Sequence, residues 1–272
     1  MENHRDLAGI HGASAWTQCE GLARDSDPVH SRNRPHAITA TLAVHDSRHI
    51  VVAVELYLAR VDQAPFARND GWILEPLSDT CWLVLVEGGG GLVIIHAANN
   101  AFPGWPAWNQ MIGLGWRGNS FGPRLHLDNE GKEVRVSKGE GPGAGHGRQH
   151  EFAVRIRDTR HPVMEGMPAE WMHVKDELYH GQRGPAQAMH ILATAYSDPA
   201  TGGTDTHEPM VWWIPYGKGR VFTNVMGHAD YSMKGVGFQT ITARGCEWAA
   251  TEKVTLPIPE NFPTAEKTSS VE

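Results

Sequence analysis

Histidine and acidic side chains follow several apolar runs of this sequence, at points where strands are expected to end. His96 follows GLVII and His228 follows VFTNVMG, and the acidic pair Asp176 and Glu177 lies between them. In open α/β sheets, ligands bind beyond the carboxyl ends of the strands. Two histidines and a carboxylate at one such edge can bind a divalent cation or act as general acid and base. The alternative is structural: each histidine ring hydrogen-bonds a backbone carbonyl where its strand ends.

A further segment, GHGRQHEF, holds His146 and His150 four residues apart. On a helix this spacing would direct both rings toward one metal ion. The glycines at 145 and 147 favour instead a loop that enters a strand, and such a loop could deliver one of the two rings. We therefore predict a zinc or manganese site with one carboxylate of the acidic pair as partner and with the histidine ligands His96, His150 and His228.

Polar and aromatic side chains near these positions are candidates for substrate binding. Asn99 and Asn100 come directly after the first histidine, and Tyr179 follows the acidic pair. Trp105 is another candidate, because the face of an indole ring is a large apolar surface on which a sugar can stack. Trp105 and Trp108 also keep the spacing of one helix face, so packing in the core is the alternative.

Several common mechanisms have no candidate residues here. No G-x-S-x-G or G-x-C-x-G segment follows a predicted strand, so a nucleophile at a strand end is not expected. The glycines of GGGGL precede a strand and lack the residues of a P-loop or a dinucleotide-binding motif, so we predict no nucleotide cofactor.

Composition narrows the cellular setting. A formal net charge of −7 argues against nucleic-acid binding, which needs a concentrated basic face. No apolar run approaches the roughly 20 residues that span a bilayer, so no membrane partner is expected. The three cysteines Cys19, Cys81 and Cys246 offer neither a disulfide framework nor a metal knuckle, which favours the cytoplasm. We expect a small-molecule partner, and self-association into a homo-oligomer stays open.

The positions of the apolar runs predict an α/β protein. Helices are expected over 104–114 and 238–250, and strands over 49–61, 81–87, 91–96, 151–157, 189–195, 209–215 and 219–226. Apolar strands that alternate with helices favour a mostly parallel sheet with helices on both faces. We predict one domain over residues 1–253 and, because it is rich in proline, an extended or disordered tail over 254–272.

Five stretches together resemble the ThuA-like (trehalose-utilisation) family over about residues 86–250. They are GGGGLVIIHAANNAFPGWPAWNQMIG, HEFAVRIRDTRHPVMEGMPAEWMHVKDELYH, ILATAYSD, EPMVWWIPYGKGRVFTNVMGH and GCEWAA. The resemblance implies a flavodoxin-like sheet that is related to that of class I glutamine amidotransferases but lacks their nucleophile cysteine. In that relation, His96 ends the strand that carries the cysteine in amidotransferases. Residues 1–87 match the family poorly, and the sequence contains no lysine there.

The resemblance also implies a function in carbohydrate catabolism. The expected substrate is a disaccharide or a 3-keto-glycoside, and the expected reaction is a hydrolase or lyase reaction, assisted by a metal ion. Two alternatives remain: a non-catalytic sugar-binding or regulatory module, and an inactive chain whose N-terminal segment is altered.

Overall fold

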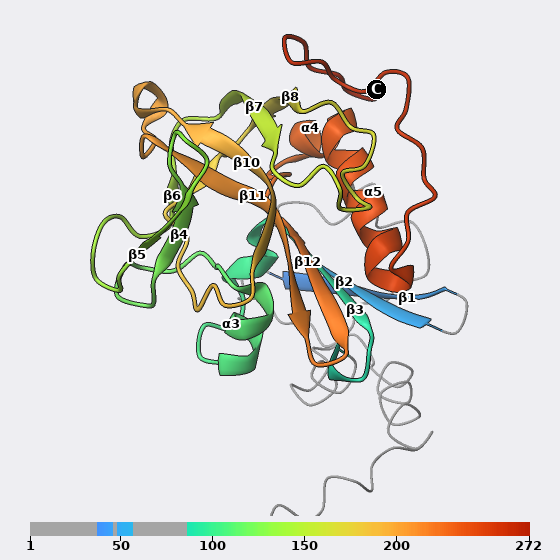
Figure 1. The fold of residues 1–272 in the computed structure, drawn as a ribbon, viewed down its shortest axis with the longest axis horizontal. Helices are drawn as coiled ribbons and strands as arrows, with labels where there is room; N and C mark the ends of the chain where they lie inside the picture. The colour runs from blue at the N-terminus through green and yellow to red at the C-terminus, as the bar shows by residue number, and fades with distance from the viewer. Residues whose placement is uncertain (1–36, 46–47, 57–85) are drawn as a thin grey trace, which may run out of the picture.

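The computed structural model describes residues 37–45, 48–56 and 86–272, and shows a curled, mixed β-sheet with few helices (Figure 1). The main sheet has the strand order β1-β2-β3-β12-β11-β10-β7-β8, and β4 pairs with β11 and β5 at one side. Its strands are β1 (Ala37–His45), β2 (Arg48–Leu56), β3 (Gly91–Ile95), β4 (Arg124–Leu127), β5 (Glu133–Val136), β7 (His150–Ile156), β8 (Glu170–Asp176), β10 (His190–Ser197), β11 (Thr206–Tyr216) and β12 (Gly219–Asn224).

Shorter elements complete the described part of the chain. A separate two-stranded sheet pairs β6 (Gly145–His146) with β9 (Tyr179–His180). The α-helices are α3 (Pro106–Ile112), α4 (Asp230–Met233) and α5 (Val236–Thr251), and the 3-10 helices are η2 (His96–Asn100) and η3 (Pro199–Thr201).

The predicted helices and most predicted strands lie close to their expected positions, and the α/β class is confirmed. The expected hairpin turn at 216–219 joins β11 to β12. The strand expected over 49–61 is present up to Leu56, and residues 57–61 lie outside the described residues. The strand expected over 81–87 falls mostly outside them too, and its last two residues, 86 and 87, are helical. β8 was not predicted.

The sheet is mixed, so the expectation of a mostly parallel sheet holds only at its centre. β2, β3 and β12 are parallel neighbours, whereas β12, β11, β10, β7 and β8 pair antiparallel in turn. Parallel strands need a long crossover connection, usually a helix, but antiparallel strands can be joined by short turns. No α-helix lies between residues 113 and 229, all of which the structure describes. The strands of that segment can therefore be connected only by turns and loops, which favours antiparallel pairing.

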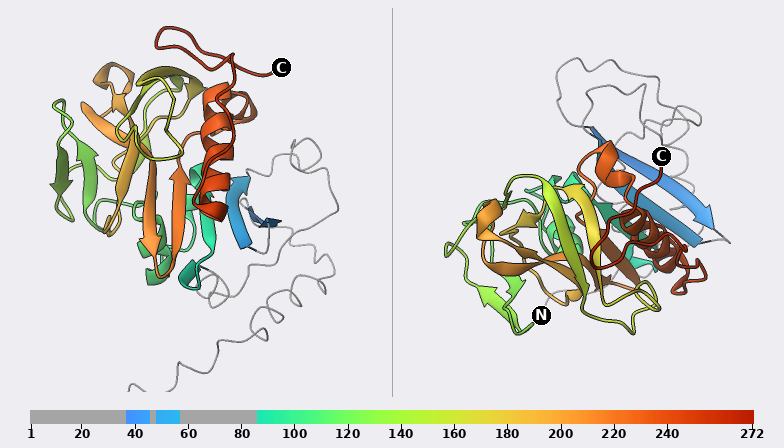
Figure 2. Two further views of the ribbon diagram at one scale, coloured as in Figure 1. Left: turned by 45° about the vertical axis from the view of Figure 1, so that its right-hand side comes forward. Right: turned by 90° about the horizontal axis from the view of Figure 1, so that it is seen from above.

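Helices cover both faces of the sheet at β3. Val93 and Ile95 belong to the core cluster that contains Ile241 and Trp248 of α5, whereas Leu92 and Ile94 pack with Trp108 and Met111 of α3. This alternation follows from the two-residue period of a strand. Figure 2 shows α5 lying along one face of the central strands. β3 therefore ends between two packed layers, and the residue after it is held from both sides.

Gly245 lets α5 approach the sheet closely. A Cβ atom at this position would lie 2.2 Å from Cε1 of Phe222, whose side chain is fully buried in β12. We expect Gly245→Ala to lower the free energy of unfolding by about 1–3 kcal/mol, because a buried ring cannot move aside without strain. Gly118→Ala is the control, since its Cβ would meet nothing within 4 Å. Urea unfolding of both variants checks this, and equal stabilities would contradict it.

A buried histidine beside α5 gives the fold an acid sensitivity. The amide of Val163 donates to Nδ1 of His161, whose ring lies 4.5 Å from that of Trp248. Burial lowers the pKa of His161 from 6.5 to about 4. Between pH 6.5 and pH 4, His161 therefore binds a proton in the unfolded chain but not in the folded chain. The free energy of unfolding falls as the pH falls through this range.

For this one group, we expect the free energy of unfolding to fall by about 2 kcal/mol between pH 7 and pH 5. His161→Gln should remove that part of the slope, whereas the exposed His190→Gln should leave it in place. Urea unfolding at the two pH values measures the difference, and parallel slopes in the wild type and His161→Gln would refute the assignment.

The C-terminal segment is extended and lies against the core. Ile258 and Phe262 pack on the core cluster that contains Trp171. Near the end of the chain, the amide of Val236 donates to the carbonyl of Ser269 at 2.9 Å, and the amide of Val271 donates to that of Lys234 at 2.9 Å. These bonds hold the junction between α4 and α5.

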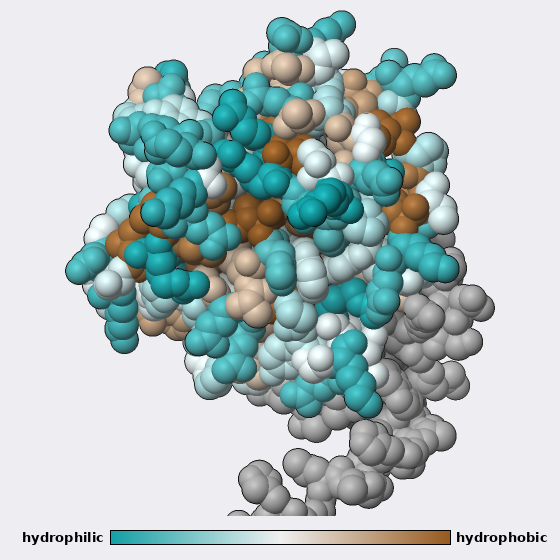
Figure 3. All heavy atoms as spheres, viewed as in Figure 1, coloured by the Kyte–Doolittle hydropathy of each residue, from teal (hydrophilic) through white to brown (hydrophobic). Residues whose placement is uncertain are grey.

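The surface shown in Figure 3 is mostly hydrophilic, with scattered apolar patches. Among the described residues, the exposed large apolar side chains are Phe121, Tyr196, Tyr231, Leu256 and Val271. A search of the described residues found no helix with the length and apolar character needed to cross a membrane.

Candidate functional site

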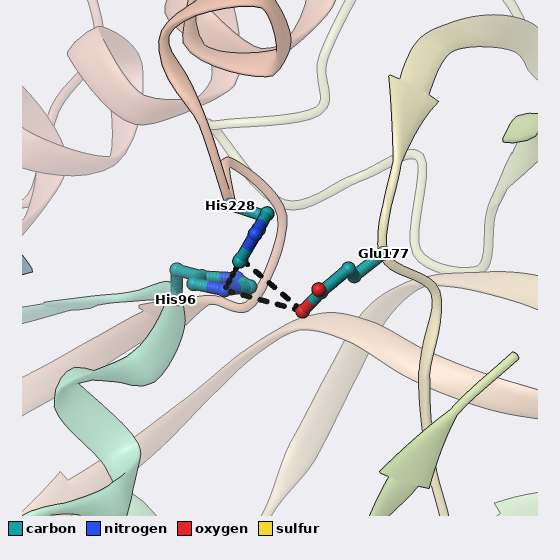
Figure 4. A group of neighbouring side chains, drawn as sticks. All are labelled: His96, Glu177 and His228. Carbon is teal, nitrogen blue, oxygen red and sulfur yellow. Dashed lines mark hydrogen bonds and ion pairs between the residues drawn. The ribbon is translucent and has the colours of Figure 1, made fainter. Parts of the chain in front are cut away.

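Three side chains from distant parts of the chain meet at one edge of the sheet (Figure 4). His96 follows β3, His228 follows β12 and Glu177 follows β8. Each offers one ligand atom, and these atoms all lie within 4.8 Å of one another. Oε2 of Glu177 is 3.2 Å from Nδ1 of His228 and 4.0 Å from Nε2 of His96. We call these residues the His–Glu–His group.

His96 is held firmly, in an unusual backbone conformation. Its φ is +47°, in the left-handed region that residues other than glycine seldom adopt and that is common at functional sites. Its Nδ1 lies 2.8 Å from the carbonyl oxygen of Val225, which can only accept, so Nδ1 carries the proton. Burial lowers the pKa of His96 to about 4, which keeps the ring neutral. Nε2 therefore faces the group with a lone pair.

Asp176 does not face the group but fixes the segments that form it. Its side chain is fully buried, and Oδ2 accepts from Nε2 of His173 at 2.8 Å and from the amide of Gly227 at 2.7 Å. Oδ1 accepts from the amides of Glu177 at 2.9 Å and His228 at 3.0 Å. Burial raises the pKa of this carboxyl, but the hydrogen bond and charge of His173 outweigh it and hold the pKa at about 2. Asp176 thus joins the segment after β8 to the segment after β12.

The second carboxylate oxygen of Glu177 has partners of its own. Nε2 of His146 lies 3.3 Å from Oε1, and Nε2 of Gln149 donates to Oε1 at 3.4 Å. The structure thus places His146, not His150, beside the group. Nδ1 of His150 is turned to the carbonyl of Arg148 at 2.8 Å. The pairing of β6 with β9 brings His146 opposite Tyr179.

The remaining predicted substrate residues divide between the site and the core. The Tyr179 hydroxyl donates to Nε2 of His96 at 2.8 Å. Asn100 is exposed beside the group, whereas Asn99 is buried and donates to Gln182 at 2.6 Å. Trp105 lies away from the group, with its ring stacked on that of Trp108 at 6.0 Å.

A hollow of about 140 Å³ adjoins the group. It is lined by Ala97, Asn100, Trp116, His146, Glu177, Tyr179 and His228. Trp116 was not predicted as a site residue, although its position before Arg117 in a glycine-rich loop favours a partly exposed side chain. A larger hollow, of about 340 Å³, lies elsewhere, among prolines of the 103–123 loops and Pro185.

Comparison with known proteins assigns the chain to a family. The family model described as trehalose utilisation (ThuA) matches residues 55–249, more than half of the sequence. The chain belongs to the ThuA family. The ThuA match contains all three members of the His–Glu–His group and begins within β2, earlier than the sequence stretches indicated.

One solved structure supports the ThuA assignment. A ThuA-like protein from Parabacteroides merdae is 42% identical, with 75% of each chain covered and a TM-score of 0.68. A ThuA-like protein from Bacteroides uniformis is 18% identical, with 66% of each chain covered and a TM-score of 0.44. A search of curated proteins gave no match.

Proposed function

We propose that this ThuA protein is a cytoplasmic carbohydrate-processing enzyme, a hydrolase or lyase that acts on a disaccharide or a 3-keto-glycoside with a bound zinc or manganese ion. The observation that carries the proposal is the His–Glu–His group, whose ligand atoms lie within 4.8 Å of one another. The description of the family, trehalose utilisation, supports a sugar as the substrate.

The donor set fits a catalytic metal ion. Two histidines and one glutamate, with a position left open for water or substrate, are a known ligand set for catalytic zinc. His96 presents an unprotonated Nε2, because its Nδ1 donates to a backbone carbonyl, as metal-binding histidines commonly do. Glu177 is anchored through its second oxygen by His146 and Gln149. A divalent cation supplies Lewis acidity, which polarises a carbonyl or activates a water molecule.

The other side chains hold the site in position. Asp176 fixes the backbone of both Glu177 and His228. The hydroxyl of Tyr179 donates to Nε2 of His96. A cation bound at Nε2 would replace this hydrogen bond and leave the hydroxyl beside the substrate. In this proposal, His146, which lies beside Glu177, binds the substrate or exchanges protons with it.

The fold relation supports the location of the site. We propose that β2, β3 and β12, which pair in parallel, are the part of the sheet that corresponds to a flavodoxin-like core. His96 then occupies the position after a central parallel strand, where ligands bind in such sheets.

Turnover by the full-length protein tests the proposed function. Protein treated with a chelator and then given Zn²⁺ or Mn²⁺ is incubated with trehalose and with its 3-keto derivative, and the products are identified by mass spectrometry. We expect product with metal and none with chelator. Sugar binding without product over long incubation would instead indicate a binding module, and turnover unaffected by chelator would exclude the role of the metal.

Tyr179→Phe separates a metal site from metal-free acid–base chemistry. This variant removes a group that competes for Nε2 of His96, so we expect Zn²⁺ affinity equal to or up to about tenfold above that of the wild type. Calorimetric titration of the chelator-treated protein measures the affinity. Weaker Zn²⁺ binding in a folded Tyr179→Phe variant would contradict this arrangement.

A further inference from the structure

The hollow beside the His–Glu–His group is small. Its volume is about 140 Å³, whereas sites for drug-sized ligands usually measure about 300–1,000 Å³. Glu177 and His228 form the wall on the side of the group, and Trp116 and Asn100 contribute to the rest. The hollow therefore suits a polar ligand about the size of one ring.

Trp116 forms a firmly held aromatic wall. Its ring lies 4.5 Å from the ring of Tyr179, which is itself bonded to His96. The preceding residue, Gly115, exchanges two backbone hydrogen bonds with Arg183, at 2.9 and 3.0 Å. A half-buried indole supported in this way presents an apolar surface that loses little conformational entropy when a ligand packs on it.

Asn100 places a polar group at the mouth of the same hollow. The guanidinium of Arg117, which is buried, donates to the carbonyl oxygen of Asn100 at 2.8 Å and to its Oδ1 at 3.4 Å. Arg117 is thus committed to holding the loop and not to binding a ligand itself. The held side-chain amide of Asn100 can donate to a hydroxyl group.

We propose that this hollow is a subsite for a single sugar ring, with Trp116 as the aromatic platform on which the ring packs. One apolar face of the ring packs on the indole, and ring hydroxyls meet Asn100 and His146. Two oxygens on neighbouring carbons of the sugar would face a cation held by the His–Glu–His group. The second ring of a disaccharide lies outside the hollow and contributes little to binding. This inference rests on the function proposed above.

Binding of one-ring and two-ring sugars tests the subsite. Methyl glucoside and trehalose are titrated into the Mn²⁺-loaded wild type, Trp116→Ala, Trp116→Phe and Trp105→Phe. Trp105 is the control, because it packs against Trp108 and does not line the hollow. We expect the two sugars to bind the wild type within about threefold of each other. Trp116→Ala should weaken both by about tenfold or more, and Trp116→Phe by much less.

The same titrations can overturn the proposal. If trehalose binds more than about thirtyfold tighter than methyl glucoside, a second ring has its own subsite and the inference is wrong. If a folded Trp116→Ala variant and the Trp105→Phe control bind sugar alike, Trp116 does not form the platform. In both cases the proposed function stands, since Mn²⁺ affinity and turnover are measured separately. If neither sugar binds the loaded wild type, the carbohydrate assignment itself fails.

Discussion

Replacing Asp176 with alanine is expected to lower the free energy of unfolding by about 3–5 kcal/mol, because it breaks a buried pair and leaves its partners uncompensated. Nε2 of His173 and the amide of Gly227 would each lose an acceptor in a buried region, and the amide of His228 would lose one in a partly buried region. Urea unfolding at pH 7 gives the stability of the variant. Because the same carboxylate anchors the His228 segment, we also expect weaker Zn²⁺ binding by the folded fraction.

Asp158→Ala is the matched control for this variant. Asp158 also accepts a backbone amide, that of Arg160, but it lies near the surface and its ion pair with Arg160 is exposed. We expect its loss to cost less than about 1 kcal/mol. If the two alanine variants were equally stable, Asp176 would not be the link between the two segments.

Replacing Glu177 with glutamine is expected to weaken Zn²⁺ binding by at least about 100-fold, while leaving the metal-free fold intact. Even partners that only orient metal ligands are worth about 10–100-fold in affinity, and Glu177 supplies the single negative charge of the group. Glutamine keeps the size of the side chain, so packing is preserved. Competition between the protein and a zinc-binding dye measures the affinity.

His150→Gln is the control here, because His150 lies four residues from His146 but outside the group. Its Zn²⁺ affinity should match that of the wild type. Unchanged affinity in Glu177→Gln would mean that the carboxylate does not hold the ion. Loss of affinity in His150→Gln would mean that the loop rearranges to supply a different ligand.

The histidine positions could be predicted from sequence because each follows an apolar run that forms a strand. His96 and His228 end β3 and β12, which turn out to be parallel neighbours with adjacent ends. Neither apolar run contains a sequence signal for that adjacency. It depends on the pairing of β3 with β12 across more than 100 residues, which is a matter of tertiary packing.

The rest of the site depends on pairings that have no local signal. Glu177 reaches the group because the antiparallel strands curl back over the sheet. The sequence predicted a mostly parallel sheet, so this curl was not expected. His146 lies beside it because β6 pairs with β9. Trp105 is the opposite case. Its helical spacing with Trp108 already offered packing in the core as the alternative, and the structure packs Trp105 against the cluster that contains Trp108.

The length of chain between the ligands has a consequence for biosynthesis. His96 and His228 are 132 positions apart, so at about 5–20 residues per second a ribosome adds the second histidine roughly 7–26 s after the first. Over that interval β3 lacks β12, and its apolar edge is open to other chains. The junction that follows His228 gains its last backbone bonds only with residues 269–271. The proposed metal site can therefore be complete only after His228 and the segment that holds it, residues 269–271 included, have been made.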